Sequence, residues 1–178
     1  GRNKITAITN LAGFRSLRIL ALPSNRITKI EGLETCDNLE ELYLGHNGVT
    51  VIENLDKNTK LNTLDLARNQ VAVIQNLEKL PCLEHLWLNN NVITDLGCVK
   101  TGLVSVLNTF NTLYLEGNPA AGESDYRLKV VSMLPNLFQL DANEVREDER
   151  AKALQLATDG SSSIAPASED QNVADVDS

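Results

Sequence analysis

Residues 61–69 read LNTLDLARN, and the phrase that they spell, Leu-x-x-Leu-x-Leu-x-x-Asn, returns at 17–25, 39–47 and 83–91. Successive copies are 22 residues apart, and a fifth copy at 110–118 has Phe110 in place of its first leucine. A fixed period of this length indicates a repeat architecture, because each unit can bury its apolar face only against its neighbours.

The leucines within each phrase alternate with other residues, which is the period of a β-strand. The central leucine of each copy, such as Leu64, is therefore expected to point inward, and its two neighbours outward. Between phrases, apolar residues at the spacing of Val71, Ile74 and Leu77 fit single turns or 3-10 segments. The sequence thus predicts an α/β fold: a leucine-rich repeat solenoid with a parallel β-sheet on its concave face and short 3-10 or helical segments on its convex face.

The asparagine that closes each phrase has a structural explanation. The chain turns sharply after each strand, and a buried turn leaves backbone N–H and C=O groups without partners. An amide side chain carries both donors and an acceptor, so stacked asparagines can form a ladder that satisfies them. We therefore do not count Asn25, Asn47, Asn69, Asn91 or Asn118 among the functional residues.

The last return is longer than the others. Asn91 and Asn118 are 27 residues apart, and apolar residues recur at roughly helical spacing from Leu96 to Leu107. An α-helix is expected there. At the other end the chain opens at Asn3, the close of a repeat phrase, without a polar capping unit, so we expect further repeats upstream.

Charge is distributed unevenly along the 178 residues. Residues 1–141 carry 13 Lys+Arg and 15 Asp+Glu, whereas residues 142–178 carry 3 and 9. The repeat body is nearly neutral, which disfavours direct nucleic-acid binding. We predict a repeat domain over 1–143 and an acidic, largely disordered tail over 144–178, in which 144–157 is compatible with a short helix.

The cysteines indicate the compartment. Cys36, Cys82 and Cys98 lie in separate repeats, form no Cys-x-x-Cys pair and are odd in number, as expected of reduced core thiols in an intracellular protein, cytoplasmic or nuclear. There is no run of 18 apolar residues, so no membrane segment is predicted.

No constellation for catalysis is found. His46 and His85 lie in different repeats without a cysteine or second histidine at metal-ligand spacing, and glycine-rich phosphate loops and nucleophile elbows are absent. We predict a protein without enzymatic activity, cofactor or metal.

The expected concave positions carry large aromatic residues. Tyr43, Trp87 and Tyr114 should face solvent on the sheet, among acidic neighbours. Aromatic residues also simply fit strands well, but three on one rigid face are typical of protein-interface anchors, and the acidic neighbours suit a basic partner. The predicted partner-binding residues are Glu41, Tyr43, Asp65, His85, Trp87, Tyr114 and Glu116. Ile19, Ala21, Thr63 and Thr112 are expected on the same face.

These repeats resemble the protein phosphatase 1 regulatory subunit 7 family, and the repeat class is shared by an outer-arm dynein light chain and a spliceosomal U2 protein. The resemblance is carried by SNRITKIEGL at 24–33, LEELYLGHNG at 39–48 and LYLEGNP at 113–119. In the C-terminal unit, DYR at 125–127, LPNL at 134–137 and LDA at 140–142 resemble the family's cap, which implies a capping segment over about 119–143. The resemblance extends to about residue 146.

The resemblance implies a function. Members of the family hold the phosphatase catalytic subunit on the concave surface without a short linear docking motif. Tyr43, Asp65, Trp87 and Tyr114 match concave positions of the family pattern, whereas His85 replaces a commonly acidic residue. The leading hypothesis is a regulatory subunit of protein phosphatase 1. A cytoskeletal adaptor that binds dynein or tubulin in an axoneme is the alternative, and a spliceosomal scaffold is the weaker one.

Overall fold

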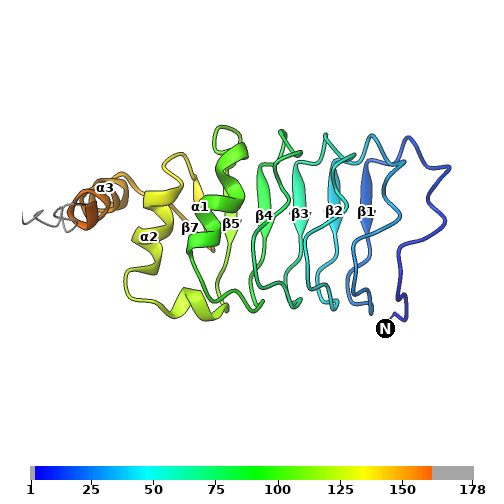
Figure 1. Ribbon diagram of the computed structural model, residues 1–178, viewed down its shortest axis with the longest axis horizontal. Coiled ribbons are helices and arrows are strands. Elements are labelled where there is room, and N and C mark those ends of the chain that lie inside the picture. The colour runs from blue at the N-terminus through cyan, green and yellow to red at the C-terminus, as the bar shows by residue number, and fades with distance from the viewer. Residues whose placement is uncertain (1–2, 162–178) are drawn as a thin grey trace, which may run out of the picture.

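The computed structural model describes residues 3–161, with side chains to residue 158, and forms one row of stacked coils (Figure 1). The row begins with the N-terminal coil at one end and finishes with a helical unit at the other. Residues 162–178, about half of the predicted acidic tail, lie outside the described residues. Within residues 3–161, none of the helices combines the length and the apolar character that a membrane crossing needs.

Each repeat phrase contributes one three-residue strand, at the predicted place. The first five strands are β1 (Ile19–Ala21), β2 (Glu41–Tyr43), β3 (Thr63–Asp65), β4 (His85–Trp87) and β5 (Thr112–Tyr114). They pair in chain order and in parallel, and each central leucine lies opposite the next, as Leu64 lies opposite Leu86. From β1 to β4 the paired residues are 22 apart and from β4 to β5 they are 27 apart, but the register is the same at each step, so equivalent side chains stand in rows across the sheet.

The core is a continuous ladder of aliphatic side chains. Leu42, Leu64, Leu86 and Leu113 are fully buried, as are the leucines that flank β2 to β4 and the inward Ile and Val residues of the returns, such as Ile52 and Val71. Val51, Val73 and Val92 of the same returns are exposed. Leu20 of β1 is only half-buried, because β1 is the edge strand and no further strand lies beyond it in the described part of the chain. Burial therefore comes from stacking between coils rather than from any one coil.

The predicted asparagine ladder is confirmed. Asn69 accepts a hydrogen bond at Oδ1 from the N–H of Val49 (2.9 Å) and donates from Nδ2 to the carbonyls of Leu44 and Leu66 (both 3.0 Å). Asn91 repeats the pattern one coil later, so the carbonyl of Leu66 receives an amide from each of two asparagines. Each amide therefore fastens its own coil to the preceding one.

On the convex side the first coils use isolated turns rather than 3-10 helices. Each turn is closed by an N–H bonded to the carbonyl three residues earlier, as Asn58 N–H bonds to the carbonyl of Leu55 (2.9 Å). A second amide ladder lies here that the sequence reasoning missed. Asn54 donates to the carbonyl of Ile30 and Asn76 to that of Ile52, both at 2.7 Å and both from a left-handed backbone conformation.

The long return forms the predicted helix, slightly shorter than expected. Helix α1 (Gly97–Leu103) continues into a 3-10 helix, η1 (Val104–Val106). Gly102 lies so close to the preceding coil that a Cβ would be 2.3 Å from the carbonyl oxygen of Ile74. A glycine is needed here because only its bare Cα allows the helix to pack onto that coil.

The C-terminal unit comprises a 3-10 helix η2 (Pro119–Gly122), helix α2 (Tyr126–Met133), strands β6 (Gln139–Leu140) and β7 (Asn143–Glu144), and helix α3 (Glu147–Ser161). Strand β6 extends the parallel sheet, whereas β7 pairs with β6 in the antiparallel sense. The sheet is thus parallel throughout except at its last strand, where the chain reverses in a tight turn with Asp141 in the left-handed conformation.

Helix α3 packs against α2, whereas the sequence reasoning assigned 144–157 to the tail as a possible short helix. Arg127 of α2 donates to both oxygens of the Glu149 carboxylate (2.5 and 3.2 Å) and to the carbonyl of Leu140 (2.9 Å). Arg150 of α3 donates to the carbonyls of Pro135 and Leu137. Two arginines therefore hold α3 on the end of the solenoid, where Figure 1 shows it beyond α2.

Cys36 and Cys98 are buried, as predicted for core thiols, but Cys82 is exposed. Cys82 precedes the first leucine of its phrase in a surface turn, so the expectation of a core position was wrong for this residue. Burial raises the pKa of the Cys36 and Cys98 thiols.

Candidate partner-binding surface

The exposed sheet face consists of the outward side chains of β1 to β5, which form two rows. The first row is Ile19, Glu41, Thr63, His85 and Thr112, and the second is Ala21, Tyr43, Asp65, Trp87 and Tyr114. Six of the seven predicted partner-binding residues stand in these rows. The seventh, Glu116, is exposed in the turn that follows β5. The rows contain no Lys or Arg, and their charged groups are Glu41, Asp65 and the ionisable His85.

Two tyrosine rings of the second row each contact the ring of Trp87, and we call Tyr43, Trp87 and Tyr114 the aromatic row. The ring centroids of Tyr43 and Trp87 are 6.0 Å apart at an interplanar angle of 53°, and those of Trp87 and Tyr114 are 6.1 Å apart at 70°. Such tilted and edge-on pairs contribute about 0.5–1.5 kcal/mol each beyond the area that they bury. The indole therefore ties β2 to β5 across β3, whose Asp65 is too small to keep the rings apart.

The aromatic side chains are less exposed than the strand pattern predicts. All three are half-buried, and the indole Nε1 of Trp87 is inaccessible to solvent and has no hydrogen-bond partner in the described part of the chain. Thr63 and Thr112, which were also expected to be open, are only 7% exposed. Each flanks His85 in register, and its hydroxyl donates to the preceding asparagine, Asn62 or Asn111.

Asp65 is fixed beneath the rings. Its Oδ1 accepts the N–H of Ala67 (2.8 Å), and burial raises the pKa of this carboxyl group, partly offset by that hydrogen bond and by His46. Gly45, in the neighbouring coil, makes room for it, because a Cβ there would stand 2.8 Å from Oδ2 of Asp65. Gly45 is thus a residue of this surface that the sequence reasoning did not single out.

The two tyrosines of the aromatic row are each held by a polar neighbour. The Tyr43 hydroxyl donates to Oε2 of Glu41 (2.7 Å), and this hydrogen bond, together with burial, raises the pKa of Tyr43 to about 12. The Tyr114 hydroxyl oxygen accepts from Nε2 of Gln139 in β6 (2.6 Å), which also donates to the carbonyl of Asp141 (2.8 Å). Gln139 was missed because β6 lies outside the repeat phrase, although its register opposite Thr112 places it in the first row.

His85 is half-exposed, and its Nε2 lies 3.8 Å from a carboxylate oxygen of Glu84. Glu84 is exposed and adds an acidic group at the margin of the exposed sheet face. The surface as a whole combines a rigid aromatic centre with Glu41, Asp65, Glu84 and Glu116 around it. This composition fits a protein partner that carries basic groups.

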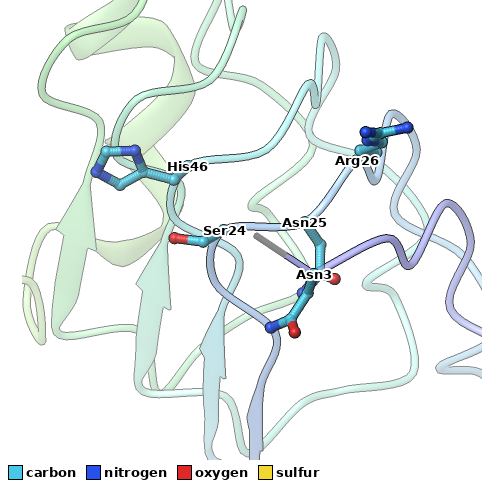
Figure 2. A pocket seen from close by; sticks show the side chains of 5 residues that line it. All are labelled: Asn3, Ser24, Asn25, Arg26 and His46. Carbon is cyan, nitrogen blue, oxygen red and sulfur yellow. The ribbon is translucent and has the colours of Figure 1, made fainter. Parts of the chain in front are cut away.

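A separate pocket of about 230 Å³ lies near the N-terminal edge, lined by Asn3, Ser24, Asn25, Arg26 and His46 (Figure 2). Figure 2 shows the side chains of Arg26 and His46 on opposite sides of Ser24 and Asn25, so the two basic groups do not converge. Among the described side chains, no three His, Cys, Asp or Glu residues are grouped as ligands for a metal ion.

Two known proteins are similar in sequence to part of this chain. It is 40% identical over 69 residues to protein phosphatase 1 regulatory subunit pprA of Dictyostelium discoideum, which covers 39% of this chain and 20% of that protein. It is 38% identical over 77 residues to U2 small nuclear ribonucleoprotein A' of Mycosarcoma maydis, or 43% of this chain and 30% of that protein. The chain thus matches less than a third of the length of these curated relatives.

A solved structure matches over nearly the whole chain. A chain in the crystal structure of the Drosophila melanogaster SNF/U2A' complex superposes with a TM-score of 0.71 at 25% sequence identity, covering 88% of this chain and 93% of that one. The leucine-rich repeat family model matches residues 16–163, from the start of the first complete phrase through helix α3. The periodic sequence, the stacked coils and this match together show that the chain belongs to the leucine-rich repeat family.

Proposed function

We propose that this chain is a non-catalytic regulatory subunit that binds the catalytic subunit of protein phosphatase 1 through the exposed sheet face. The observation that carries the proposal is the aromatic row with its acidic surroundings, a preformed anchor at the centre of a rigid sheet. The similarity to the phosphatase regulatory subunit pprA supports this choice of partner.

The anchors explain why binding would be concentrated at this place. Interfaces derive most of their binding energy from a few central residues, among which Trp and Tyr are enriched. Trp87 contacts two other rings and is already half-buried, so little side-chain freedom remains to be lost when a partner covers it.

The test is a binding titration of the purified chain with the purified catalytic subunit, by calorimetry or surface immobilisation. Replacing Trp87 and Tyr114 together by alanine should weaken binding by a few kcal/mol, about 2 or more for a central anchor. Lys57→Ala, in an exposed turn outside the strands, is the matched control and should bind like the wild type. Binding by the double variant at wild-type affinity would remove the exposed sheet face from the interface.

A second candidate is a structural subunit of a ribonucleoprotein particle. It is favoured by the similarity to U2 small nuclear ribonucleoprotein A' and by the match to the SNF/U2A' complex over most of the chain. In that case the partner is a protein of the particle rather than RNA, because residues 1–141 carry a nearly balanced 13 Lys+Arg and 15 Asp+Glu. Parallel titrations with the phosphatase catalytic subunit and with an SNF-type protein distinguish the two.

The cytoskeletal alternative, an adaptor for dynein or tubulin, receives no support from the relatives described above. Co-sedimentation of the purified chain with microtubules and with dynein heavy chain would support this cytoskeletal alternative. We further propose a cytoplasmic or nuclear location, for which the support is three cysteines that are all free thiols. Imaging of the tagged protein in its own cell would check this.

A further inference from the structure

The hydrogen-bond directions at the two ends of the aromatic row are fixed by the neighbours of the two tyrosines. At the β2 end, the Tyr43 hydroxyl lies 2.7 Å from a carboxylate oxygen of Glu41. An ionised carboxylate can only accept hydrogen bonds, so Tyr43 must donate its proton to it. What the phenol then offers to a partner is an oxygen lone pair, next to the carboxylates of Glu41 and Asp65.

At the β5 end the direction is reversed. Nε2 of Gln139 lies 2.8 Å from the carbonyl oxygen of Asp141, and a carbonyl can only accept. The amide nitrogen, and not the amide oxygen, must therefore face this side. The same nitrogen lies 2.6 Å from the Tyr114 hydroxyl and donates to it. The proton of Tyr114 has no acceptor among the described residues, so it is available to a partner.

Trp87 stands between these two ends and contacts both rings. The ring centroids of Tyr43 and Tyr114 lie 6.0 Å and 6.1 Å from that of Trp87, so these two rings are at most about 12 Å apart. The surface therefore presents an acceptor end with negative charge, an apolar centre, and a donor end.

We propose that this face binds its partner segment in one direction only, a proposal that rests on the proposed function of the face as a protein-binding surface. One protein segment places a Lys or Arg side chain at Tyr43 and Glu41, lays an apolar side chain on Trp87, and offers a carbonyl oxygen to the Tyr114 hydroxyl at the other end of the aromatic row. A segment bound in the opposite direction would bring its carbonyl to a carboxylate and its cation to a hydroxyl proton. Gln139 is then a positioning residue, because it sets the direction of the Tyr114 hydroxyl without touching the partner.

Two small probes test this on the full chain by amide NMR, without any partner. Guanidinium is a donor-only cation, and N,N-dimethylacetamide is an acceptor-only amide. Guanidinium, at concentrations well below denaturing, should shift resonances of residues 41–43 and 65, and dimethylacetamide those of 112–114 and 139. Tyr114→Phe should abolish the dimethylacetamide response and leave the guanidinium response intact. Glu41→Gln should abolish the guanidinium response and leave the dimethylacetamide response intact. Equal responses of both ends to either probe, or a dimethylacetamide response that survives Tyr114→Phe, would overturn the proposal.

Titration with the phosphatase catalytic subunit separates this proposal from the proposed function. Tyr114→Phe keeps the ring and its contact with Trp87 but loses the hydroxyl and its hydrogen bond from Gln139, so it should stay folded and melt only slightly below the wild type. It should bind about 2- to 13-fold more weakly, the effect of one neutral hydrogen bond to the partner. Wild-type affinity in this variant refutes the orientation proposal while phosphatase binding stands. A wild-type chain that does not bind the phosphatase, but whose two ends respond to the probes as expected, refutes the partner and leaves the orientation proposal supported.

Discussion

The asparagine ladder allows a stability change to be worked out bond by bond at Asn69. In Asn69→Ala, the N–H of Val49 loses its only side-chain acceptor, and Val49 is fully buried. The carbonyls of Leu44 and Leu66 each lose one amide but keep another, from Asn47 and Asn91 respectively. One orphaned donor costs about 1–3 kcal/mol and each of two lost bonds about 0.5–1.5 kcal/mol, so the total loss is about 2–6 kcal/mol.

Asn25→Ala is the matched control, because Asn25 makes the equivalent hydrogen bonds in the coil at the N-terminal edge of the sheet. Its Oδ1 accepts the N–H of Ile5, but Ile5 is 41% exposed, so water can replace the lost partner. We expect a loss of about 0.5–1.5 kcal/mol there. Urea unfolding followed by the fluorescence of Trp87 measures both variants, and amide hydrogen exchange at Val49 reports the orphaned group directly. Equal losses at the two positions would show that burial of the backbone groups is not what makes the ladder stabilising.

Three further changes test other parts of the structure. Asn58 is fully buried with an unpaired Oδ1, whereas Leu80 fills the equivalent place one coil later. Asn58→Leu should therefore raise the free energy of unfolding by about 1–2 kcal/mol in urea titrations. A decrease would mean that the two hydrogen bonds donated by the Asn58 amide outweigh the cost of its unpaired oxygen. Burial raises the pKa of Asp65, so the stability of the wild type falls as pH rises through that raised value. Asp65→Asn should therefore melt at a higher temperature than the wild type at neutral pH but not in acid, and it should bind a basic partner more weakly. The hydrogen bond from Arg127 lowers the pKa of Glu149 to about 2, so its contribution is present above the ordinary carboxyl value of about 4.3 and is lost as pH falls from there toward 2. Glu149→Gln should remove that acid dependence and increase hydrogen exchange in α3, and an unchanged pH profile would show that the pair does not hold the helix.

Strand positions, inward leucines and the first amide ladder could be predicted because every coil meets the same surroundings. Period alone then determines which side of the chain faces the core. The second ladder was also within reach: Gly32, Asn54 and Asn76 recur at 22 residues, each before a leucine, and Gly and Asn are the residues that adopt a left-handed conformation most readily.

The rest depends on contacts that no period encodes. Helix α3 is held by two arginines that reach backbone carbonyls 13 to 15 residues away, and such contacts leave no trace in composition. For the same reason, the strand pattern predicts that Tyr43 and Trp87 point outward, but not that their rings meet over a strand carrying the smaller Asp65. Half-burial of the aromatic row is a property of three coils together.

The return that contains α1 shows where this architecture tolerates change in length. Although that stretch is 27 residues long instead of 22, Asn118 still bonds to the carbonyl of Leu88 and to the N–H of Ile93, just as its shorter counterparts do. Insertions placed there leave the register of the strands untouched. Evolution can therefore lengthen the back of a coil while the side that meets other molecules keeps its layout, and a designer could graft new segments at that point with the same freedom.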